Sequence, residues 1–436
     1  MTNRTSSIVE FPRCSRRRVE ASFAGGDITS DGGVLLLRQA AARSGLLRRV
    51  AALIEDPRRV ASCDHSLRSV LEQRVFALAL GYEDLNDHET LRRDVALQTG
   101  VGRDRTLAHP STLCRLERRA DRSWAWAVHQ ALFEHFVASM AAPPDEIVLD
   151  FDNTDDLVHG HQVGRHFSGY YRQYCFLPLY VFCGDHLLVA HLQPASEDGA
   201  KRARGILALL VRAIRKTWPN TKILLRGDNG FCRLPLLRWC ERNGVGYLIG
   251  LAKNKRLVAA IEPDLREVAE LHQEVGTRQR KFVDLRYAAK TWDCERRVIA
   301  KAEHQARGSN PRFIVTNLGG NARDLYERDY CARGDMENRI KEQQLDMFAD
   351  RTSCHHWWPN QWRMLLSGLA YTLLASIRRI GLIGTDMARA TCGTIRLCLL
   401  KIGAVIVKNT RRVRFLLSSA YPRQRLFFQV AKRLSG

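Results

Sequence analysis

The stretch Glu146-Ile147-Val148-Leu149-Asp150-Phe151-Asp152 predicts a buried strand that ends in two carboxylates. Side chains alternate along a strand, so Asp150 and Asp152 share one face while Phe151 packs on the other. A single aspartate at a strand end is usually a turn or cap residue. Two of them on one face, directly after an apolar run, make this strand end a candidate functional site.

The residues that follow alternate between strand and helix patterns. Gly184-Asp185 separates two apolar runs and predicts a tight hairpin turn between them. A second acidic turn, Arg226-Gly227-Asp228-Asn229-Gly230, closes a later apolar run. The predicted strands are 146–152, 174–183, 186–192, 222–226 and 246–251, and the predicted helices are about 199–216 and 234–243. This order of strands and helices is that of a ribonuclease-H-like fold.

Residues 254–326 interrupt this order with a helix and a strand-rich block. The helix that completes the core begins near Arg333, and a long apolar helix follows it from Trp357 to Arg379. Three tryptophans at the start of that helix are expected to pack where it docks on the rest of the protein; they are Trp357, Trp358 and Trp362. We therefore predict an α/β fold with a ribonuclease-H-like mixed sheet, a β-rich insertion and an all-helical N-terminal region.

Both ends of the chain are basic. The first 28 residues carry five arginines, Arg4 among them, and little apolar periodicity, which predicts an extended basic arm. His109 to Leu116 has a Pro and hydroxyl start followed by basic residues, which fits either a DNA-recognition helix or an ordinary surface helix. The predicted domains are a basic arm at 1–28, a helical DNA-binding region at 29–142, a catalytic domain at 143–253 and 327–380, an insertion at 254–326, and a basic helical C-terminal region at 381–436.

Charge is the strongest indication of a partner. The 436 residues include 68 Lys and Arg against 46 Asp and Glu, a net charge of +22 that attracts polyanions, double-stranded DNA first among them. An anionic membrane surface, a ribosomal partner or a basic solvated surface are the alternatives. No apolar run reaches the roughly 18 to 20 residues that a membrane span needs, so no membrane partner is expected.

The twelve cysteines are scattered and form no Cys-x-x-Cys pair, so we expect reduced thiols in a cytosolic protein. Cys354-His355-His356 suggests zinc, but no second ligand pair accompanies it at finger-like spacing. We therefore expect an ordinary loop there.

Three acidic positions far apart in the sequence suit one divalent-metal site. Tyr330, Arg333 and Glu337 fall on one face of a predicted helix start, at successive turns. Glu337 joins Asp228 and the strand-end aspartates as a candidate ligand, and Gly227 and Gly230 let the backbone beside Asp228 approach a ligand closely. Carboxylates on a strand end, a turn and a helix are what phosphodiester chemistry with two Mg²⁺ ions needs.

Residues 146–379 resemble the catalytic domain of DDE transposases from bacterial insertion sequences, the group marked by a Tyr-x-x-Arg-x-x-x-Glu signature. Several segments resemble most closely the insertion-sequence thirteen-eighty family, which is related to piggyBac-like elements. Those segments are Asp150 to Asp156, Gly169-Tyr170-Tyr171, Leu177 to Phe182, Arg226 to Phe231 and Arg333 to Glu342.

The resemblance assigns roles to individual residues. It implies Asp152, Asp228 and Glu337 as catalytic residues and metal ligands, with Asp150 as the alternative to Asp152. Tyr330 and Arg333 correspond to DNA contacts near the cleavage point. The signature's downstream Lys is replaced by Gln344, and Lys341, one turn beyond Glu337, is the candidate substitute DNA contact. In the insertion, Trp292 corresponds to an aromatic platform for a flipped base; packing in the core is its other interpretation.

The resemblance also implies a reaction. It predicts cut-and-paste transposition at terminal inverted repeats with two Mg²⁺ ions, for which Mn²⁺ is an expected substitute, and a hairpin on the transposon end. A homodimer is expected to pair the two ends, in the bacterial cytoplasm at the nucleoid. Two rivals remain: a DNA-binding protein without catalysis, and a nuclease that hydrolyses without joining ends.

Overall fold

The computed structural model describes residues 8–59 and 63–436, which form two compact units. The terminal unit comprises the chain up to Ala120 together with Asp346–Phe348 and Leu369–Gly436. The sheet unit comprises Asp121–Leu345 and Ala349–Gly368. Arg4 of the predicted basic arm lies outside the described residues.

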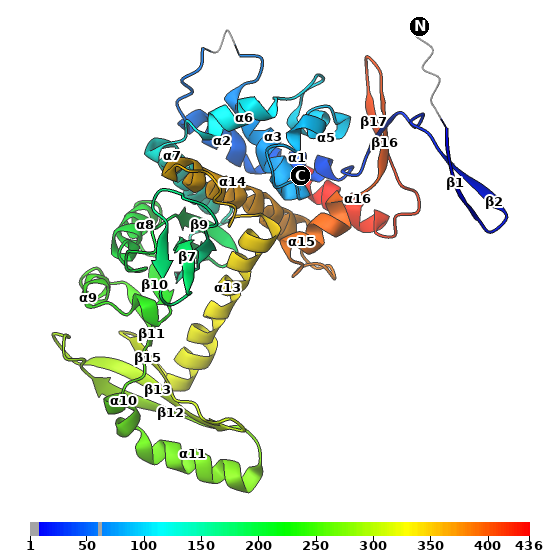
Figure 1. Cartoon of the computed structure of the whole chain (residues 1–436). Coiled ribbons are helices and arrows are strands. Elements are labelled where there is room, and N and C mark those ends of the chain that lie inside the picture. The colour runs from blue at the N-terminus through cyan, green and yellow to red at the C-terminus, as the bar shows by residue number, and fades with distance from the viewer. Residues whose placement is uncertain (1–7, 60–62) are drawn as a thin grey trace. The chain divides into compact units, whose positions relative to one another are not determined.

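A nine-stranded mixed sheet forms the centre of the sheet unit (Figure 1). Its order is β12-β13-β15-β11-β10-β4-β8-β9, and the short strand β14 pairs with β13. The strands are β4 (Glu146–Asn153), β8 (Leu179–Cys183), β9 (His186–His191), β10 (Lys222–Gly227), β11 (Gly246–Leu251), β12 (Gln279–Tyr287), β13 (Arg296–Gln305), β14 (Gly308–Ser309) and β15 (Arg312–Thr316). A separate three-stranded sheet contains β5 (Asp156–Leu157), β6 (His166–Ser168) and β7 (Gln173–Phe176). The fold is therefore mixed α/β, as the sequence predicts.

Strand β4 lies between strands of opposite direction. It pairs in parallel with β10, which pairs in parallel with β11, and on its other side it pairs antiparallel with β8. The hairpin predicted at Gly184-Asp185 is present between β8 and β9. The predicted boundaries of β4, β10 and β11 agree with the observed ones to within one residue.

The sequence predicts the strands of the insertion but not their place in the fold. Strand β15 pairs antiparallel with β11, so β15, β13 and β12 continue the main sheet and do not form a separate block. Phe313, Ile314 and Val315 point alternately to the two faces of β15, and all three are buried. Both faces of this strand must therefore be covered, as they are in the main sheet.

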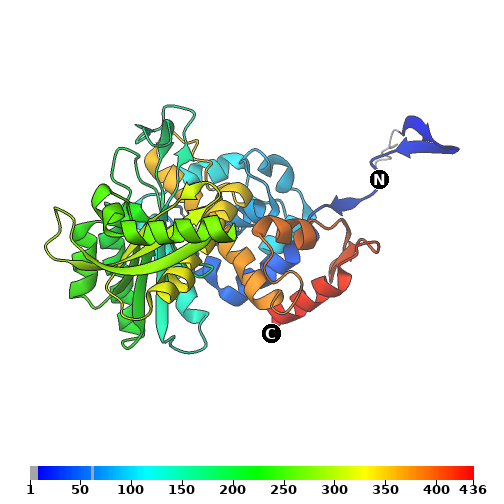
Figure 2. The same ribbon diagram turned by 90° about the horizontal axis from the view of Figure 1, so that it is seen from below.

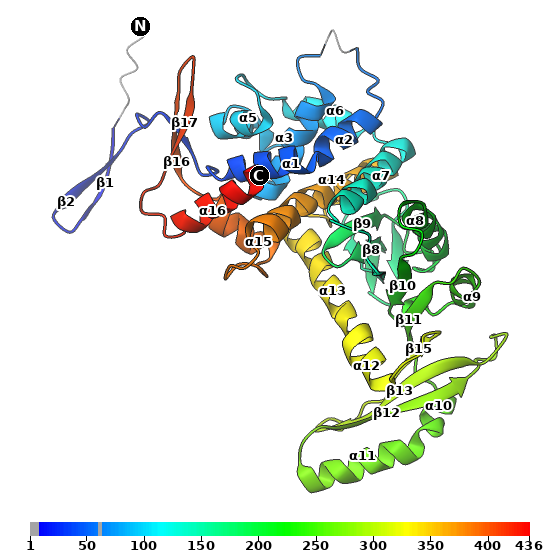
Figure 3. The ribbon, with the colours of Figure 1, turned by 180° about the vertical axis from the view of Figure 1, so that it is seen from behind.

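Helices cover both faces of the sheet. On one face, Leu149 and Leu225 pack in a core with α8 (Ala203–Thr217), α9 (Leu234–Arg242) and α11 (Glu262–Val275). Figure 2 shows α11 lying along β12 and β13. The short helix α10 (Lys255–Ala260) precedes α11 in the chain. On the other face, Leu224 and Leu248 pack against Leu325 and Tyr326. Figures 1 and 3 show α8 and α9 on one side of the strands and α13 on the other.

Leu325 and Tyr326 belong to a long, irregular helical run that carries the signature residues. Its segments are α12 (Ala322–Asp324), a π-helical turn η3 (Leu325–Tyr330), a 3₁₀ turn η4 (Cys331–Arg333), α13 (Gly334–Lys341) and a second π-helical turn η5 (Glu342–Asp346). π-Helical turns inside helices are rare and are frequent at functional sites. This run starts at Ala322, about three turns before the predicted start near Arg333. A π-helical or 3₁₀ turn lies on each side of α13.

The remaining helices of the sheet unit are α7 (Arg122–Ala138) and the first part of α14 (Trp357–Ser376), which continues into the terminal unit. Trp362 is buried, and its ring meets the edge of Trp124 on α7 at 5.2 Å. Trp357 contacts Phe176 in the same edge-to-face manner. Trp357 and Trp362 therefore lie in the packing seam that the sequence predicts for this helix.

Helices dominate the terminal unit, which also contains strands that the sequence analysis missed. The helices are α1 (Val34–Ser44), α2 (Leu46–Leu53), α3 (Leu67–Leu80), α4 (His88–Leu91), α5 (Val95–Val101), α6 (Pro110–Glu117), α15 (Cys392–Ile395) and α16 (Gln424–Ser435), with π-helical turns η6 (Ile377–Gly381) and η7 (Arg396–Leu400). The strands are β1 (Val9–Cys14), β2 (Arg17–Ala21), β3 (Asp27–Thr29), β16 (Ala404–Lys408) and β17 (Val413–Leu417).

Two expectations for the ends of the chain are corrected. Within the predicted extended arm, β1 and β2 form an antiparallel hairpin. The C-terminal region is not helical throughout, because β16 pairs with β17 and with β3 from the other end of the chain. Val405-Ile406-Val407 is a β-branched run, and such residues favour strands.

Gly33, at the start of α1, is where the N-terminal helices meet the C-terminal segment inside this unit. The Gly33 amide donates to the Leu400 carbonyl at 3.1 Å, and the neighbouring Gly32 amide donates to Ile402 at 2.9 Å. A Cβ atom at Gly33 would collide with the Leu399 carbonyl and the Leu400 Cα, which are backbone atoms that cannot rotate away.

We expect Gly33→Ala to lower the free energy of unfolding of the terminal unit by about 3 kcal/mol, because the added methyl forces two backbones apart. Urea denaturation followed by circular dichroism measures this loss. The matched control is Gly403→Ala, next to the same contact, where a Cβ meets no atom within 4 Å. Equal stability of the two variants would show that the close contact is unimportant.

Candidate active site

Strand β4 presents its polar residues to one face of the sheet. Phe151 is buried in the core beneath α8 and α9, whereas Asp150 and Asp152 project to the opposite face, where the helical run with Arg333 lies. Both aspartates are nearly enclosed, with 5% and 14% of their side chains exposed. A buried carboxylate needs a cation or several hydrogen bonds, so the partner of each aspartate indicates its role.

Asp150 is held by Arg226 from the neighbouring strand. The two residues are register partners on β4 and β10, and the guanidinium contacts both carboxylate oxygens at 2.6 and 2.7 Å. Arg226 also donates to the carbonyl of Asp329 in the helical run. Both Asp150 oxygens are thus engaged in a buried, bidentate ion pair that joins two strands and a helix. This arrangement suits a structural role.

Asp152 and Glu337 share one arginine. Arg333 contacts Asp152 Oδ2 at 3.0 Å through one terminal nitrogen and Glu337 Oε1 at 2.6 Å through the other. The second Asp152 oxygen accepts from the Asn153 amide at 3.0 Å. Glu337 is half exposed, so the pair opens toward solvent on its side. The arginine thus bridges two of the three predicted ligands.

Asp228 stands at the turn that leaves β10. Its Oδ1 accepts from the Gly230 amide at 2.9 Å and so caps the short 3₁₀ turn η2 (Asn229–Phe231). This is the turn role that an aspartate commonly has at a strand end. The charge of Asp228 also acts on Asp152 nearby.

The site carries excess negative charge. Burial raises the pKa of Asp152 to about 6; Arg333 opposes this rise, and the charges of Asp228 and Glu337 add to it. One guanidinium therefore does not neutralise the three carboxylates. Among the described residues, no group of three or more His, Cys, Asp or Glu side chains is arranged to hold a metal ion. The oxygen donors nevertheless suit Mg²⁺ chemically, and the surplus charge is what a divalent cation would balance.

Tyr330, the last residue of η3, packs against Gly250 on β11. A Cβ at Gly250 would lie 2.8 Å from the Tyr330 hydroxyl oxygen and 2.8 Å from the Asn229 amide nitrogen, so the absence of a side chain at Gly250 makes room for both. Burial raises the pKa of Tyr330, with Asp228 adding to the effect and Arg333 opposing it. The tyrosine therefore lies near two of the predicted site residues and is mostly enclosed.

Gln344, which stands where the signature has Lys, and Lys341, its candidate substitute, lie in different environments. Gln344 donates from its side-chain amide to the Asp155 carbonyl at 2.8 Å and contacts the Thr154 hydroxyl. It thereby ties η5 to the loop that follows Asp152. Lys341 is exposed on α13. Gln344 has a structural contact next to the site, and Lys341 has the exposure that a DNA contact requires.

Trp292 lies away from the carboxylates, in the turn between β12 and β13. Its ring is half buried against the main core and meets Tyr287 edge to face at 5.8 Å. The guanidinium of Arg296 lies over the ring at 5.4 Å. One face of the indole is therefore occupied, and the core interpretation of this residue describes its present contacts.

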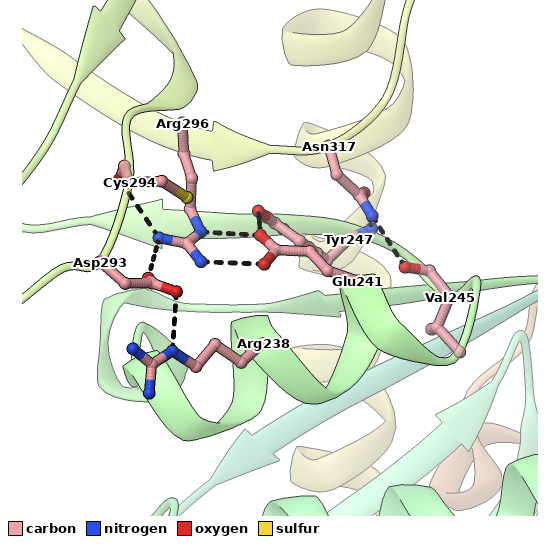
Figure 4. Close-up of polar contacts among 8 residues, drawn as sticks. All are labelled: Arg238, Glu241, Val245, Tyr247, Asp293, Cys294, Arg296 and Asn317. Carbon is pink, nitrogen blue, oxygen red and sulfur yellow. Dashed lines mark hydrogen bonds and ion pairs between the residues drawn. The ribbon is translucent and has the colours of Figure 1, made fainter.

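A polar network holds the turn that carries Trp292 (Figure 4). Arg296 is 3% exposed and pairs bidentately with Glu241 on α9 at 2.7 and 2.8 Å. It also contacts Asp293 at 3.0 Å, and Asp293 pairs in turn with Arg238 at the surface. The Tyr247 hydroxyl donates to Glu241 at 2.8 Å. The network fixes the insertion's turn to the central sheet.

No local pattern in the sequence identifies Arg226 or Arg296 as a structural partner. Arg226 could have been found from the strand register, because β4 and β10 are parallel neighbours that place Arg226 opposite Asp150. For Arg296, the partner Glu241 lies 55 residues away on a helix, and no periodicity links the two.

The other chemical motifs behave as ordinary structure. His109 caps α6 by accepting from the Ser111 amide, and Arg115 on that helix is exposed. A DNA-reading role for this helix stays a prediction. The twelve cysteines all lie within the described residues, and none of them forms a disulfide. The Cys354-His355-His356 segment is a loop before α14, and the Asn360 side chain bonds the Cys354 backbone on both sides. No helix in the described part of the chain has the length and apolarity to cross a membrane.

A family model for the transposase DDE domain, group 1, matches residues 11–436. The chain belongs to this transposase family. None of the curated proteins matches it. Among solved structures, a piggyBac transposase synaptic complex with hairpin DNA is similar at a TM-score of 0.42 and 10% identity, over 85% of this chain and 79% of that chain. The narrower resemblance to the insertion-sequence thirteen-eighty family stays a prediction.

The charge surplus of this transposase-family site has a measurable effect on stability. The folded-state pKa of Asp152 lies above its ordinary value of 3.8, so the folded state binds the proton more tightly than the unfolded chain does. Ionised Asp152 therefore destabilises the fold, and this penalty is absent below about pH 4 and complete above about pH 6 to 7.

In the presence of a chelator, we expect Asp152→Asn to raise the free energy of unfolding by about 1 to 3 kcal/mol at pH 8, and to make little difference at pH 4. Denaturant titrations at the two pH values measure the change. The control is Asp335→Asn, an exposed carboxylate on the same helix as Glu337, which should change neither value. A loss of stability at pH 8 would contradict the surplus of negative charge.

Two arginines of the network beside Trp292, one buried and one exposed, should differ in their contribution to stability. We expect Arg296→Met to lower the free energy of unfolding by about 2 kcal/mol, because it leaves Glu241 without its buried partner. Arg238→Met removes a pair that is exposed on both sides and should cost less than about 1 kcal/mol. Denaturant titration of both variants tests this, and equal losses would mean that Arg296 does not anchor the turn.

Proposed function

We propose that this protein is a metal-dependent DNA transposase that moves an insertion sequence by a cut-and-paste route, cleaving at terminal inverted repeats and joining the freed ends to target DNA. The observation that carries the proposal is the grouping of Asp152, Asp228 and Glu337 around Arg333 in a chain of the transposase DDE family. The net charge of +22 supports double-stranded DNA as the substrate.

We also propose that the catalytic core is ribonuclease-H-like. The support is the order of five strands around β4. On one side lies the hairpin of β8 and β9, with β8 antiparallel to β4, and on the other side lie β10 and β11, both parallel to β4. In this order the C-terminal end of β4 lies beside the turn after β10, and Arg333 connects the end of β4 to Glu337 on α13. Carboxylates from these three elements are then held by rigid supports.

Asp152, Asp228 and Glu337 are the residues we assign to hold two Mg²⁺ ions, with Mn²⁺ as a substitute. When bound, such ions supply an activated water for attack on the phosphate and stabilise the leaving 3′ oxygen. Asp150 is not assigned to this set, because both of its oxygens contact Arg226.

Arg333 and Tyr330 are proposed to contact the transposon end. The Arg333 guanidinium is a planar fork with five donors, and a DNA phosphate suits it as a bidentate acceptor. We propose that Arg333 exchanges one of its carboxylate contacts for a phosphate when DNA is bound. Because Tyr330 packs close to Asp228, its hydroxyl is placed to orient the same phosphate group. Lys341 is exposed on the same helix as a further DNA contact.

The proposed active form is an assembly of two copies of the chain. Paired cleavage of two transposon ends requires two active sites, so we propose a homodimer that acts on chromosomal and element DNA in the bacterial cytoplasm, at the nucleoid. We also propose a hairpin on the transposon end, because the family resemblance implies one. The rival function is a transposase-derived protein that binds DNA without cleaving it.

Cleavage of labelled inverted-repeat DNA with Mg²⁺ tests the function. We expect Asp152→Ala, Asp228→Ala and Glu337→Ala each to lose at least about 10³-fold in cleavage rate, because metal ions contribute several kcal/mol to phosphoryl transfer. Asp335→Ala on the same helix is the control and should cleave like the parent protein. Asp150→Ala should lose stability.

The outcomes separate the rivals. Binding without cleavage by the parent protein would support the inactive DNA-binding protein, and cleavage without joined product would support a nuclease. If Asp152→Ala cleaved normally while a folded Asp150→Ala did not, the first ligand would be Asp150.

A further inference from the structure

The last fifty residues of the chain differ from the rest in charge. Asp386 is the last acidic residue, and residues 387–436 contain eleven Lys and Arg and no Asp or Glu. They contribute +11 of the net charge of +22, which is half of the total from about one ninth of the chain. The eleven are Arg389, Arg396, Lys401, Lys408, Arg411, Arg412, Arg414, Arg423, Arg425, Lys432 and Arg433.

The basic side chains at the base of this segment already have partners in the terminal unit. Lys401 pairs with Asp31 at 2.7 Å, Arg423 pairs with Asp386 at 2.9 Å, and Arg433 donates to the carbonyl of Gly381 at 2.9 Å. Arg396 donates to the carbonyl of Ala79 on α3 at 2.9 Å. These contacts hold the segment to its own unit.

The tip of the β16–β17 ribbon is different. Arg411 and Arg412 are exposed in the turn, and Arg414 is exposed at the start of β17. Among the described residues, no carboxylate forms an ion pair with any of the three. Lys408, the last residue of β16, donates to the Asp104 carbonyl at 2.8 Å. The ribbon therefore places three cations together at its tip without neutralising them.

The ribbon is a preformed element. At the tip, Asn409 Oδ1 accepts from the Arg411 and Arg412 amides at 3.0 and 2.9 Å, and the Asn409 amide donates to the Arg412 carbonyl at 2.9 Å. These bonds close the turn in the way that Asn side chains commonly do. At the base, β16 pairs with β3. Figures 1 and 3 show the ribbon extending beyond α1 and α16 within this unit.

The two faces of the ribbon have different environments. Ala404 and Ile406 are buried against the unit, and their register partners Leu417 and Phe415 share that face. The other face presents Val405, Val407 and Leu416, with 39, 43 and 53% of each residue exposed, and Arg414 opposite Val407. An exposed apolar stripe beside a cationic tip suits a partner that is anionic at its edges and apolar between them.

We propose that the β16–β17 ribbon is a DNA-binding element that enters the major groove of double-stranded DNA. The major groove, about 12 Å wide, admits a two-stranded ribbon, and the minor groove of about 6 Å does not. Arg411, Arg412 and Arg414 bind phosphates or guanine edges, and the valines face thymine methyl groups. This proposal rests on DNA being the substrate, and it adds a site outside the carboxylate cluster.

The test compares two triple variants that remove the same charge. Arg411→Ala, Arg412→Ala and Arg414→Ala together remove the ribbon tip. Arg204→Ala, Arg212→Ala and Lys216→Ala together remove three exposed cations from α8 in the sheet unit. Fluorescence anisotropy with a labelled duplex, repeated between 50 and 200 mM salt, gives the slope of log affinity against log salt for each protein.

We expect the ribbon variant to reduce that slope by about 3, since each phosphate contact contributes about 0.9. The α8 variant should reduce it by less than about 1. Dimethyl sulfate footprinting, which reports guanine N7 in the major groove, should lose protected guanines with the ribbon variant only. An unchanged slope, or a reduced slope with the guanine protection intact, would overturn the major-groove assignment.

Two controls separate this proposal from its premise. If the parent protein bound no duplex at all, the proposed function itself would fail. If the parent bound and cleaved DNA and the ribbon variant did the same with the parent's salt slope, only the ribbon proposal would fail. Sedimentation of both proteins without DNA completes the test, because a dimer lost in the ribbon variant, with DNA affinity intact, would assign the ribbon to a second copy of the chain.

Discussion

The active-site end of the sheet unit depends on how two aspartates on one face of β4 are kept charged inside a protein. Burying a carboxylate without a partner costs several kcal/mol, so each aspartate requires a cation within reach. Asp150 receives Arg226 from β10, and Asp152 receives Arg333 from the helical run. These two ion pairs fasten β4 to its neighbouring strand and to the helical run that carries the signature residues. Strand register, helix position and site chemistry thus follow from one electrostatic requirement.

The two ion pairs differ in what they leave available. Arg226 is matched one to one with Asp150, and neither is exposed enough to exchange its partner for solvent. Arg333 is shared between Asp152 and Glu337 and also acts on Asp228, so one positive charge faces three negative ones. The first pair is complete and therefore structural. The second is incomplete, and an incomplete, half-open group of oxygen donors is a reactive arrangement when metal ions and phosphate are present.

The sequence was sufficient where structure follows from local pattern. Strands β4, β10 and β11, the hairpin at Gly184-Asp185 and the shared face of Asp150 and Asp152 follow from apolar periodicity and turn residues. The single strand predicted at 174–183 is wrong, because the chain forms two strands there, β7 and β8, which belong to different sheets. It was insufficient where a contact joins distant segments: the pairing of β15 with β11, the Arg226 partner of Asp150, and β3 beside β16. Two terminal hairpins were missed because their strands lie among basic residues, and only the C-terminal hairpin contains a β-branched run, Val405-Ile406-Val407. Trp292 shows the same limit, since its neighbours come from Tyr287 and Arg296 on two strands.

Arginine serves opposite purposes in different parts of the chain, and the difference lies in the carboxylates near it. Within the sheet unit, Arg226, Arg296 and Arg333 are enclosed and matched with acidic groups, so they contribute order and little external field. After Asp386 no acidic residue remains, and the arginines of the ribbon tip face solvent. The net charge of +22 is therefore unevenly distributed, because half of it comes from residues 387–436, which contain no acidic residue. Acidic partners for that segment come only from outside it, as Asp31 does for Lys401 and Asp386 for Arg423. A polyanion is the partner that such an arrangement favours, and a narrow ribbon brings that charge to a groove rather than to a flat surface.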